Sequence, residues 1–427
     1  MKTIINPSKS VWTQILQRPT KTVDEIESKV IQIFEDVQKN GDVAVNKYTK
    51  LFDGVALESN KVSPEEIEEA LPLVSDALKA AIQVAKENIT KFHTAQKTAK
   101  VFVETAKGVS CWQEKRPIQK VGLYIPGGTA PLFSTVLMLA IPAQIAGCKE
   151  IVLCSPPNKE GKLPAAILYA ANLCGVTKII KVGGIQAIAG YTFGTAAIPQ
   201  VYKIFGPGNQ FVTVAKQLAT KYGVAIDMPA GPSELLVVAD TSAKASYVAS
   251  DLLSQAEHGA DSQVILVSTS KELIQEVEIE IEKQLLELPR AEIAQKAIDN
   301  SKSIFVENDE IALELINQYG PEHFIVCTHN NDFYVDHIAN AGSVFIGNYT
   351  PESAGDYASG TNHTLPTNGF SKAYSGVNLD SFTKSITFQE ISKEGIKTIG
   401  KSIELMAASE GLEAHKNAVS IRLKDLK

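Results

Sequence analysis

Cysteines are few in this chain, and they form no recognisable motif. There are five, an odd number without CxxC spacing, at Cys111, Cys148, Cys154, Cys174 and Cys327. A disulfide framework is therefore not expected, and reduced thiols in a cytoplasmic protein are the simplest interpretation. The last four lie in apolar stretches that predict core positions.

Long apolar runs and an excess of positive charge are also missing. The longest apolar stretch, residues 136–147, is too short to span a bilayer and contains a proline, so we expect no membrane partner. The start of the chain lacks the apolar core of a signal peptide, and we expect none. A net charge of −7 gives no indication of nucleic-acid binding.

What the chain does have is the composition of an ordinary globular protein. Apolar residues make up 44% and charged residues 21%. Because 427 residues are too many for a single core, we expect at least two domains.

From residue 121 onward, short apolar runs alternate with helical stretches. The first series of runs is VGLYIP, EIVLCSPP, KIIKVGG and VYKIFGPGN. The second series is ELLVVAD, QVILVSTS, SIFVEN, FIVCT and SVFIGN. Strands that alternate with helices predict an α/β fold with two Rossmann-like parallel-sheet domains.

The order of these series leaves two layouts open, namely two domains in succession or one domain inserted in the other. We predict the insertion. The predicted parts are an N-terminal helical segment (1–20), a first α/β domain (21–120 and 233–370), an inserted second α/β domain (121–232) and a helical C-terminal tail (371–427). The tail lies outside the alternation of strands and helices, so we expect it to pack on its own domains or on a second subunit.

Four histidines lie beside acidic or amide residues. Gln255 and His258 are three residues apart near the end of a helix expected from about Ala243 to His258, so they share a face. An amide oxygen and an imidazole placed in this way can chelate a metal. Taken alone, the spacing favours the simpler interpretation of a histidine stabilised at a helix end.

The other three pairs lie further along the chain. Glu322 and His323 lie between a helix and a strand, where one can transfer a proton and the other can orient it or activate water. The remaining pairs are Asp356 with His363, within the glycine-rich residues 351–369, and Glu410 with His415. A zinc site with nitrogen and oxygen ligands, plus a separate histidine for proton transfer, explains this pattern economically. We expect the last three histidines, His93, His329 and His337, to lie on the solvated surface.

Two glycine-rich turns each follow a strand and precede a helix. YIPGGTAP and FGPGNQF occupy the position at which phosphates meet the amino end of a helix. Neither turn is GxGxxG. The turns alone therefore predict only an anionic or nucleotide ligand.

Taken together, these segments resemble the histidinol dehydrogenase family. The resemblance is carried by VGLYIPGGTAP, VGGIQAIAG, FGPGNQFV, DMPAGPSE, SQAEHGADSQ, GPEHF, SAGDYASGTNHTLPT and EGLEAHKNAVSIR, in the family's order over nearly the whole chain. It implies oxidation of L-histidinol through the aldehyde to L-histidine, the last step of histidine biosynthesis, with two NAD consumed. It also implies a homodimer with exchanged C-terminal tails.

The resemblance also implies a role for individual residues. It implies one zinc per subunit, held by Gln255, His258, Asp356 and His415. Glu322 and His323 would transfer protons. Substrate contacts would come from Ser233, Gln255, His258, His323, Asp356, His363, Glu410 and His415. NAD contacts would come from Tyr124, Gln186 and Asn209.

Two other functions fit part of the sequence. A thiol-dependent aldehyde dehydrogenase would use Cys111 as its nucleophile, although no histidine is adjacent to Cys111. A non-catalytic zinc- or nucleotide-binding relative would be expected to lack a proton-transfer residue, whereas Glu322 and His323 are both present.

Overall fold

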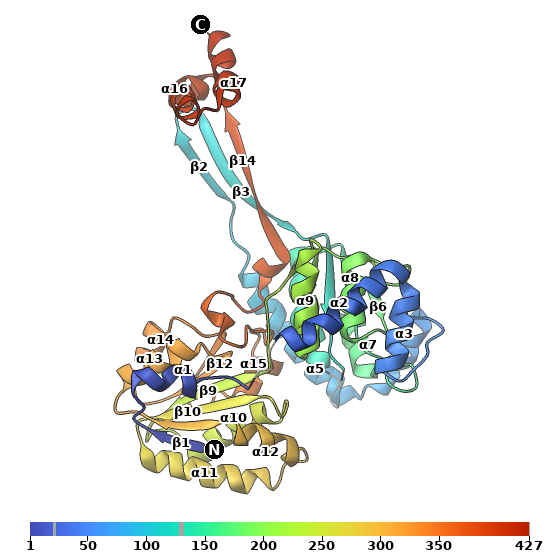
Figure 1. Ribbon diagram of the computed structural model, residues 1–427, viewed down its shortest axis with the longest axis vertical. Coiled ribbons are helices and arrows are strands. Elements are labelled where there is room, and N and C mark those ends of the chain that lie inside the picture. The colour runs from blue at the N-terminus through green and yellow to red at the C-terminus, as the bar shows by residue number, and fades with distance from the viewer. Residues whose placement is uncertain (20–22, 128–131, 427) are drawn as a thin grey trace.

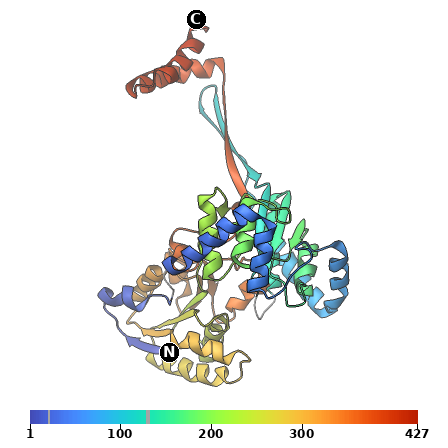
Figure 2. The same cartoon turned by 45° about the vertical axis from the view of Figure 1, so that its right-hand side comes forward.

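The protein consists of two α/β lobes and a long arm that projects away from both (Figures 1 and 2). The computed structural model describes residues 1–19, 23–127 and 132–426. The first glycine-rich turn, at 127–131, therefore lies mostly outside the described residues. Within them, no helix combines the length and the apolarity needed to cross a membrane.

The first lobe is built on a six-stranded parallel sheet. In spatial order its strands are β1 (Lys2–Ile5), β11 (Lys302–Phe305), β10 (Gln263–Ser268), β9 (Glu234–Ala239), β12 (His323–Cys327) and β13 (Ser343–Ile346). Every residue of β9 is buried, as the continuous apolar run ELLVVA predicts for a strand covered on both faces.

Helices cover both faces of this sheet. Leu235 and Val237 of β9 pack on one side and Leu236 and Val238 on the other, because side chains alternate along a strand. The first face carries α10 (Ala245–Ala256), α11 (Lys271–Leu285) and α12 (Ala291–Asp299). The second carries α1 (Trp12–Ile15), α13 (Asp309–Tyr319) and α14 (Asn331–His337).

The second lobe is built on a five-stranded parallel sheet. Its order is β6 (Lys178–Ile180), β5 (Glu150–Cys154), β4 (Lys120–Tyr124), β7 (Lys203–Phe205) and β8 (Ala225–Ile226). One face packs against α2 (Val23–Asn40), α3 (Asp42–Phe52), α8 (Gly184–Phe193) and α9 (Gln210–Lys221). The other packs against α4 (Pro64–Ala70), α5 (Asp76–Ala95), α6 (Phe133–Ala146) and α7 (Ala165–Leu173).

The arm is an antiparallel sheet with a helical hairpin at its tip. Its strands are β2 (Val101–Ala106), β3 (Val109–Pro117) and β14 (Thr383–Ile391), and its helices are α16 (Lys393–Ser409) and α17 (Glu413–Lys424). Figure 1 shows the hairpin far from both lobes, with the C-terminus at its end. The arm exposes large apolar side chains: Val101, Phe102, Val103, Leu405, Met406, Leu412 and Ile421.

The predicted α/β fold with two parallel sheets is confirmed, but three details differ. The N-terminal segment was expected to be helical, yet it contains β1, an edge strand that pairs with the remote β11. The C-terminal tail was also expected to be helical, yet it contains β14, which pairs with β3 over nine residues. In both cases the strand is stabilised by a partner hundreds of residues away in the sequence.

The third difference concerns residues 21–120, which the prediction grouped with 233–370. Their helices α2 to α5 pack on the five-stranded sheet instead. An amphipathic pattern shows that a helix has an apolar face, but it does not show which sheet that face covers. The exact domain limits stay a prediction.

Candidate active site and nucleotide cleft

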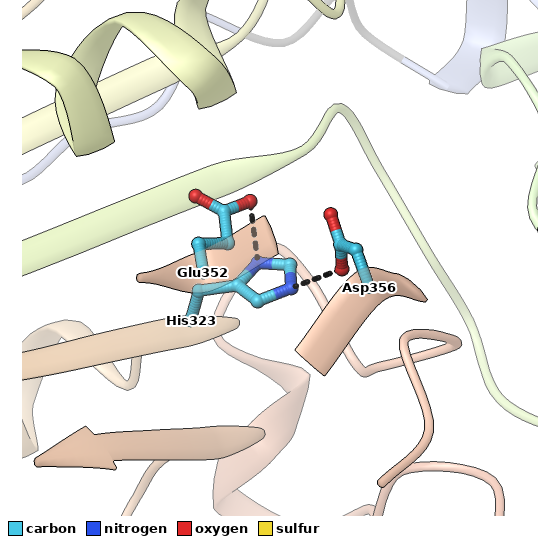
Figure 3. A group of neighbouring side chains, drawn as sticks. All are labelled: His323, Glu352 and Asp356. Carbon is cyan, nitrogen blue, oxygen red and sulfur yellow. Dashed lines mark ion pairs between the residues drawn. The ribbon is translucent and has the colours of Figure 1, made fainter. Parts of the chain in front are cut away.

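The predicted proton-transfer residues lie at the amino-terminal edge of the six-stranded sheet. His323 is the first residue of β12, Glu322 precedes it, and both are buried. Helix α15 (Glu352–Tyr357) brings two more carboxylates to the same place, because Glu352 and Asp356 are one helical turn apart. Figure 3 shows Glu352 and Asp356 on opposite sides of the His323 ring.

The His323 imidazole is surrounded by acidic groups. Its Nδ1 lies 3.6 Å from Oε2 of Glu322 and 3.7 Å from Oε1 of Glu352, and its Nε2 lies 3.7 Å from Oδ1 of Asp356. Burial alone would lower the pKa of His323, but the carboxylates of Glu352, Glu322 and Asp356 raise this pKa well above its usual value. The surrounding carboxylates therefore favour the protonated, imidazolium form of His323.

A cation would fit among these side chains. The ligand atoms of His323, Glu352 and Asp356 all lie within 4.8 Å of one another. Gln255, fully buried at the end of α10, has neither amide atom hydrogen-bonded to any described residue, and the same is true of both carboxylate oxygens of Glu352. Buried polar atoms without partners are costly, so this donor set is suited to a bound metal ion or a polar ligand.

Gln255 and His258 occupy the end of α10 much as predicted, although the helix is shorter than expected. It runs from Ala245 to Ala256, so His258 belongs to the turn that follows it. His258 is exposed in the single chain. Desolvation by the surrounding protein nevertheless lowers the pKa of its imidazole, and the carboxylate of Asp356 opposes this effect. A histidine with a lowered pKa is neutral near pH 7, as a metal ligand must be.

His363 links the cluster to the other lobe. Its Nδ1 lies 2.9 Å from the backbone oxygen of Asp356, and its Nε2 lies 3.0 Å from Oγ1 of Thr135 on α6. Burial lowers the pKa of the His363 imidazole. Two further bonds cross the same junction: Asn362 Nδ2 donates to the backbone oxygen of Met138, and Asn88 Nδ2 donates to that of Ala358. The cluster therefore lies where the two lobes meet.

His93 also belongs to this junction, so its prediction as a surface residue is wrong. It is fully buried, with Nδ1 3.0 Å from the backbone oxygen of Ile89 and Nε2 3.5 Å from Nδ2 of Asn362. His329 and His337 are exposed, as predicted. Of the predicted core cysteines, Cys154, Cys174 and Cys327 are buried, and Cys148 is partly buried.

The second lobe has a cleft at the carboxyl edge of its sheet. The chain runs outward from β4 to β5 and β6 and then returns to β7 on the other side of β4. Tyr124 ends β4, and Asn209 follows β7 and caps α9 by accepting a hydrogen bond from the N–H of Val212. Open α/β sheets bind their ligands at such a topological switch point.

This cleft has a volume of about 680 Å³ and is lined by two of the three predicted cofactor contacts, Tyr124 and Asn209. The Tyr124 hydroxyl accepts a hydrogen bond from the N–H of Gly184, the first residue of α8. Gln186, the third predicted contact, is buried on α8, and neither of its amide atoms is hydrogen-bonded to a described residue. The size and the polar groups suit a nucleotide-sized ligand.

The remaining predicted site residues are more scattered. Ser233 is partly buried directly before β9. Glu410 and His415 are exposed at the tip of the arm, so a single chain does not bring them to the cluster (Figure 1). Cys111 lies on β3 in the arm, opposite Gln389 of β14. That position gives no support to a thiol-dependent mechanism.

Glu352 is the residue of the cluster that the sequence analysis missed. The signal was present, because Glu352 precedes Asp356 by four residues in a segment already singled out. A helix of only six residues within a glycine-rich stretch is hard to predict, so the shared face was not seen.

A switch-point cleft in one α/β lobe and a buried proton-accepting cluster at the junction with the other are the features of a two-lobed oxidoreductase. The comparisons with known proteins agree, and the chain belongs to the histidinol dehydrogenase family. A sequence model of that family, described as histidinol dehydrogenase, matches residues 16–423.

Individual relatives agree over the full length. The histidinol dehydrogenase of Bacteroides thetaiotaomicron is 58% identical over 427 residues, covering 100% of both chains. That of Escherichia coli K12 is 54% identical over 417 residues, covering 97% of this chain and 95% of the relative. A crystal structure of histidinol dehydrogenase from Elizabethkingia anophelis has 56% sequence identity and a TM-score of 0.97, covering 100% of this chain and 98% of that one.

The cleft contains one carboxylate whose titration can be tested. Burial raises the pKa of Asp53 to about 6, and its Oδ2 has no hydrogen-bond partner among the described residues. The folded protein therefore holds this proton more tightly than the unfolded chain. As pH rises from about 4 to about 6 the folded state loses stability, and the loss stays constant above that range.

We predict that Asp53→Asn removes this loss. Without nucleotide, the variant should be more stable than the wild type by about 1 kcal/mol above pH 6, since partial exposure of Asp53 reduces the effect. Below about pH 4 the difference should vanish. Urea unfolding at several pH values measures it, with the exposed Asp332→Asn as control. A stability difference that does not change with pH would contradict the prediction.

Proposed function

We propose that this protein catalyses the NAD-dependent, zinc-dependent oxidation of L-histidinol through L-histidinaldehyde to L-histidine, with two NAD consumed. The observation that carries the proposal is the His323 imidazole, buried among the carboxyl groups of Glu322, Glu352 and Asp356. The buried amide of Gln255, at the end of α10, adds a group that has no hydrogen-bond partner among the described residues. Membership of the histidinol dehydrogenase family supports it. A cytoplasmic location remains part of the proposal.

Zinc would be held by Gln255, His258 and Asp356, with His415 supplied by a second copy of the chain. When bound, zinc supplies a template for nitrogen and oxygen atoms of the substrate. Because the protein ligands are an amide, imidazoles and a carboxylate, manganese or cobalt could also bind this site. Glu352 lies next to this set; burial raises the pKa of its carboxyl group to about 8, and a bound cation would favour its ionised form.

His323 accepts the hydroxyl proton of the alcohol as hydride leaves its carbon. The surrounding carboxylates stabilise the imidazolium that results. Glu322 then takes a proton from water, which adds to the aldehyde and gives the hydrate for the second hydride transfer. The cleft bounded by Tyr124 and Asn209 would hold NAD, which would supply the hydride acceptor for each oxidation.

The arm supports exchange of tails in a homodimer. Its tip carries Glu410 and His415 and exposes the apolar side chains of Leu405, Met406 and Leu412. An apolar surface of this kind usually marks an interface. A second copy that covers it would place His415 and Glu410 in the partner's cluster.

Product stoichiometry and metal dependence test the function. We expect two NADH for each L-histidinol, measured by absorbance. Activity should be lost after removal of metal by a chelator and return with zinc, in step with bound metal measured by elemental analysis. One NADH per substrate, or full activity without metal, would contradict the proposal.

Glu322→Gln separates the two oxidations. Because the amide cannot take a proton from water, oxidation of added histidinaldehyde should slow by about 10²–10⁴-fold, the usual contribution of general base catalysis. The first oxidation, for which His323 is the proposed base, should slow much less. Equal losses in both half-reactions would argue against these roles.

Mixed dimers test the exchange of tails. A His415→Asn chain and a Glu322→Gln chain should each oxidise added histidinaldehyde very slowly when alone. After mixing under conditions that exchange subunits, half of the sites in each heterodimer combine an intact body with an intact tail, so roughly a quarter of wild-type activity should return. If each chain completes its own site, mixing should restore nothing.

A further inference from the structure

A buried ion pair lies behind the proton-transfer residues, and none of the roles described so far uses it. Arg18, from the segment after α1, binds the carboxylate of Glu234 through two nitrogens: Nε donates to Oε2, and Nη2 donates to Oε1 at 2.8 Å. The side chain of Glu234 is 2% exposed and that of Arg18 is 15% exposed. The pair is bidentate, which fixes orientation as well as distance.

Arg18 also holds the loop that carries the catalytic pair. Its Nη2 donates to the backbone oxygen of Tyr319 at 3.0 Å and lies 3.4 Å from that of Gly320, at the end of α13. The guanidinium carbon lies 3.9 Å from the centre of the Tyr319 ring. Residues 319–323 are all buried, so their carbonyl groups need partners within the protein.

Glu234 connects this pair to the chemistry through its backbone. Its N–H donates to Oε2 of Glu322 at 2.9 Å, and its carbonyl oxygen lies 3.4 Å from Nδ1 of His323. One residue therefore contacts both proposed proton-transfer groups with its main chain, while its side chain is held by Arg18.

Two further side chains close the network. The Tyr319 hydroxyl lies 3.0 Å from Oε1 of Gln263 and 3.3 Å from Oε2 of Glu234, and it donates to one of them at a time. Gln263 Nε2 donates to the backbone oxygen of Gln17, the neighbour of Arg18. The N-terminal segment is thus tied to the first residues of β9 and β10 and to the loop before β12.

We infer that Arg18 and the side chain of Glu234 are positioning residues that fix the main chain of Glu234, and through it the carboxylate of Glu322 and the imidazole of His323. This inference rests on the proposed roles of Glu322 and His323. A buried ion pair contributes little net stability compared with apolar side chains of similar size. The ion pair includes the residue whose main chain contacts Glu322 and His323, so its role is explained better by holding those groups in place than by stabilising the fold.

The test removes both charges together. Arg18→Met alone would leave the Glu234 carboxylate buried without its partner and could unfold the protein. The double variant Arg18→Met/Glu234→Gln avoids this, because the glutamine keeps the shape and an acceptor oxygen for Tyr319. The control is Lys9→Met/Glu314→Gln, which removes an exposed ion pair of the same lobe.

If the inference is correct, kcat of the Arg18/Glu234 variant falls about 10- to 100-fold, as expected for misplaced catalytic groups, while KM for L-histidinol stays within about threefold. Amide hydrogen exchange in residues 319–323 becomes faster in the same variant. The control changes neither quantity. Unchanged kcat together with unchanged exchange would overturn the inference.

A cycle with Glu322→Gln shows whether the network acts through Glu322. If it does, the triple variant oxidises histidinaldehyde no more slowly than Glu322→Gln alone, because the group being positioned is already lost. If the fold-losses of the Arg18/Glu234 variant and of Glu322→Gln multiply in the triple variant, the network does not act through Glu322. Failure of the wild type to produce NADH would reject the proposed function. Hydrogen exchange needs no substrate, so it would still decide whether Arg18 and Glu234 fix the loop at residues 319–323.

Discussion

The site depends on the cost of burying charge where two lobes meet. Four ionisable groups, Glu322, His323, Glu352 and Asp356, lie within a few ångströms of one another and out of water. Such a group is tolerated only when its members compensate one another or when a ligand completes the set. The same compensation raises the pKa of the His323 imidazole.

The two sheets contribute opposite edges to the catalytic arrangement. The nucleotide-sized cleft lies at the carboxyl edge of the five-stranded sheet, as is usual for open α/β sheets. The acidic cluster lies at the amino edge of the six-stranded sheet, where strands seldom carry a site. The contact between His363 and Thr135 joins the two lobes next to this cluster.

Much of the fold followed from local pattern, and the failures have a common cause. ELLVVA and QVILVS are continuous apolar runs, and both are fully buried strands. By contrast, the strands at Lys2–Ile5 and Thr383–Ile391 gain stability from distant partners, and their own patterns are weak. In the second of these, Ile386 and Phe388 do alternate with polar residues, a signal that the surrounding helical segments concealed. At the site, Gln255, His258, Asp356 and His363 were singled out from the sequence. Glu352 shares a helical face with Asp356, but a six-residue helix is hard to predict, and Arg18 and Glu234 are recognisable only once the chain is folded.

The exposed arm has a consequence for the life of the newly made protein. A chain that leaves the ribosome alone carries Phe102, Leu405 and Met406 on a slender projection far from its own lobes. Uncovered apolar surface of this kind promotes nonspecific association. If a second copy covers this surface, as proposed above, the yield of folded protein should rise more steeply than its rate of synthesis. Association of two chains would then compete with aggregation and proteolysis of single chains.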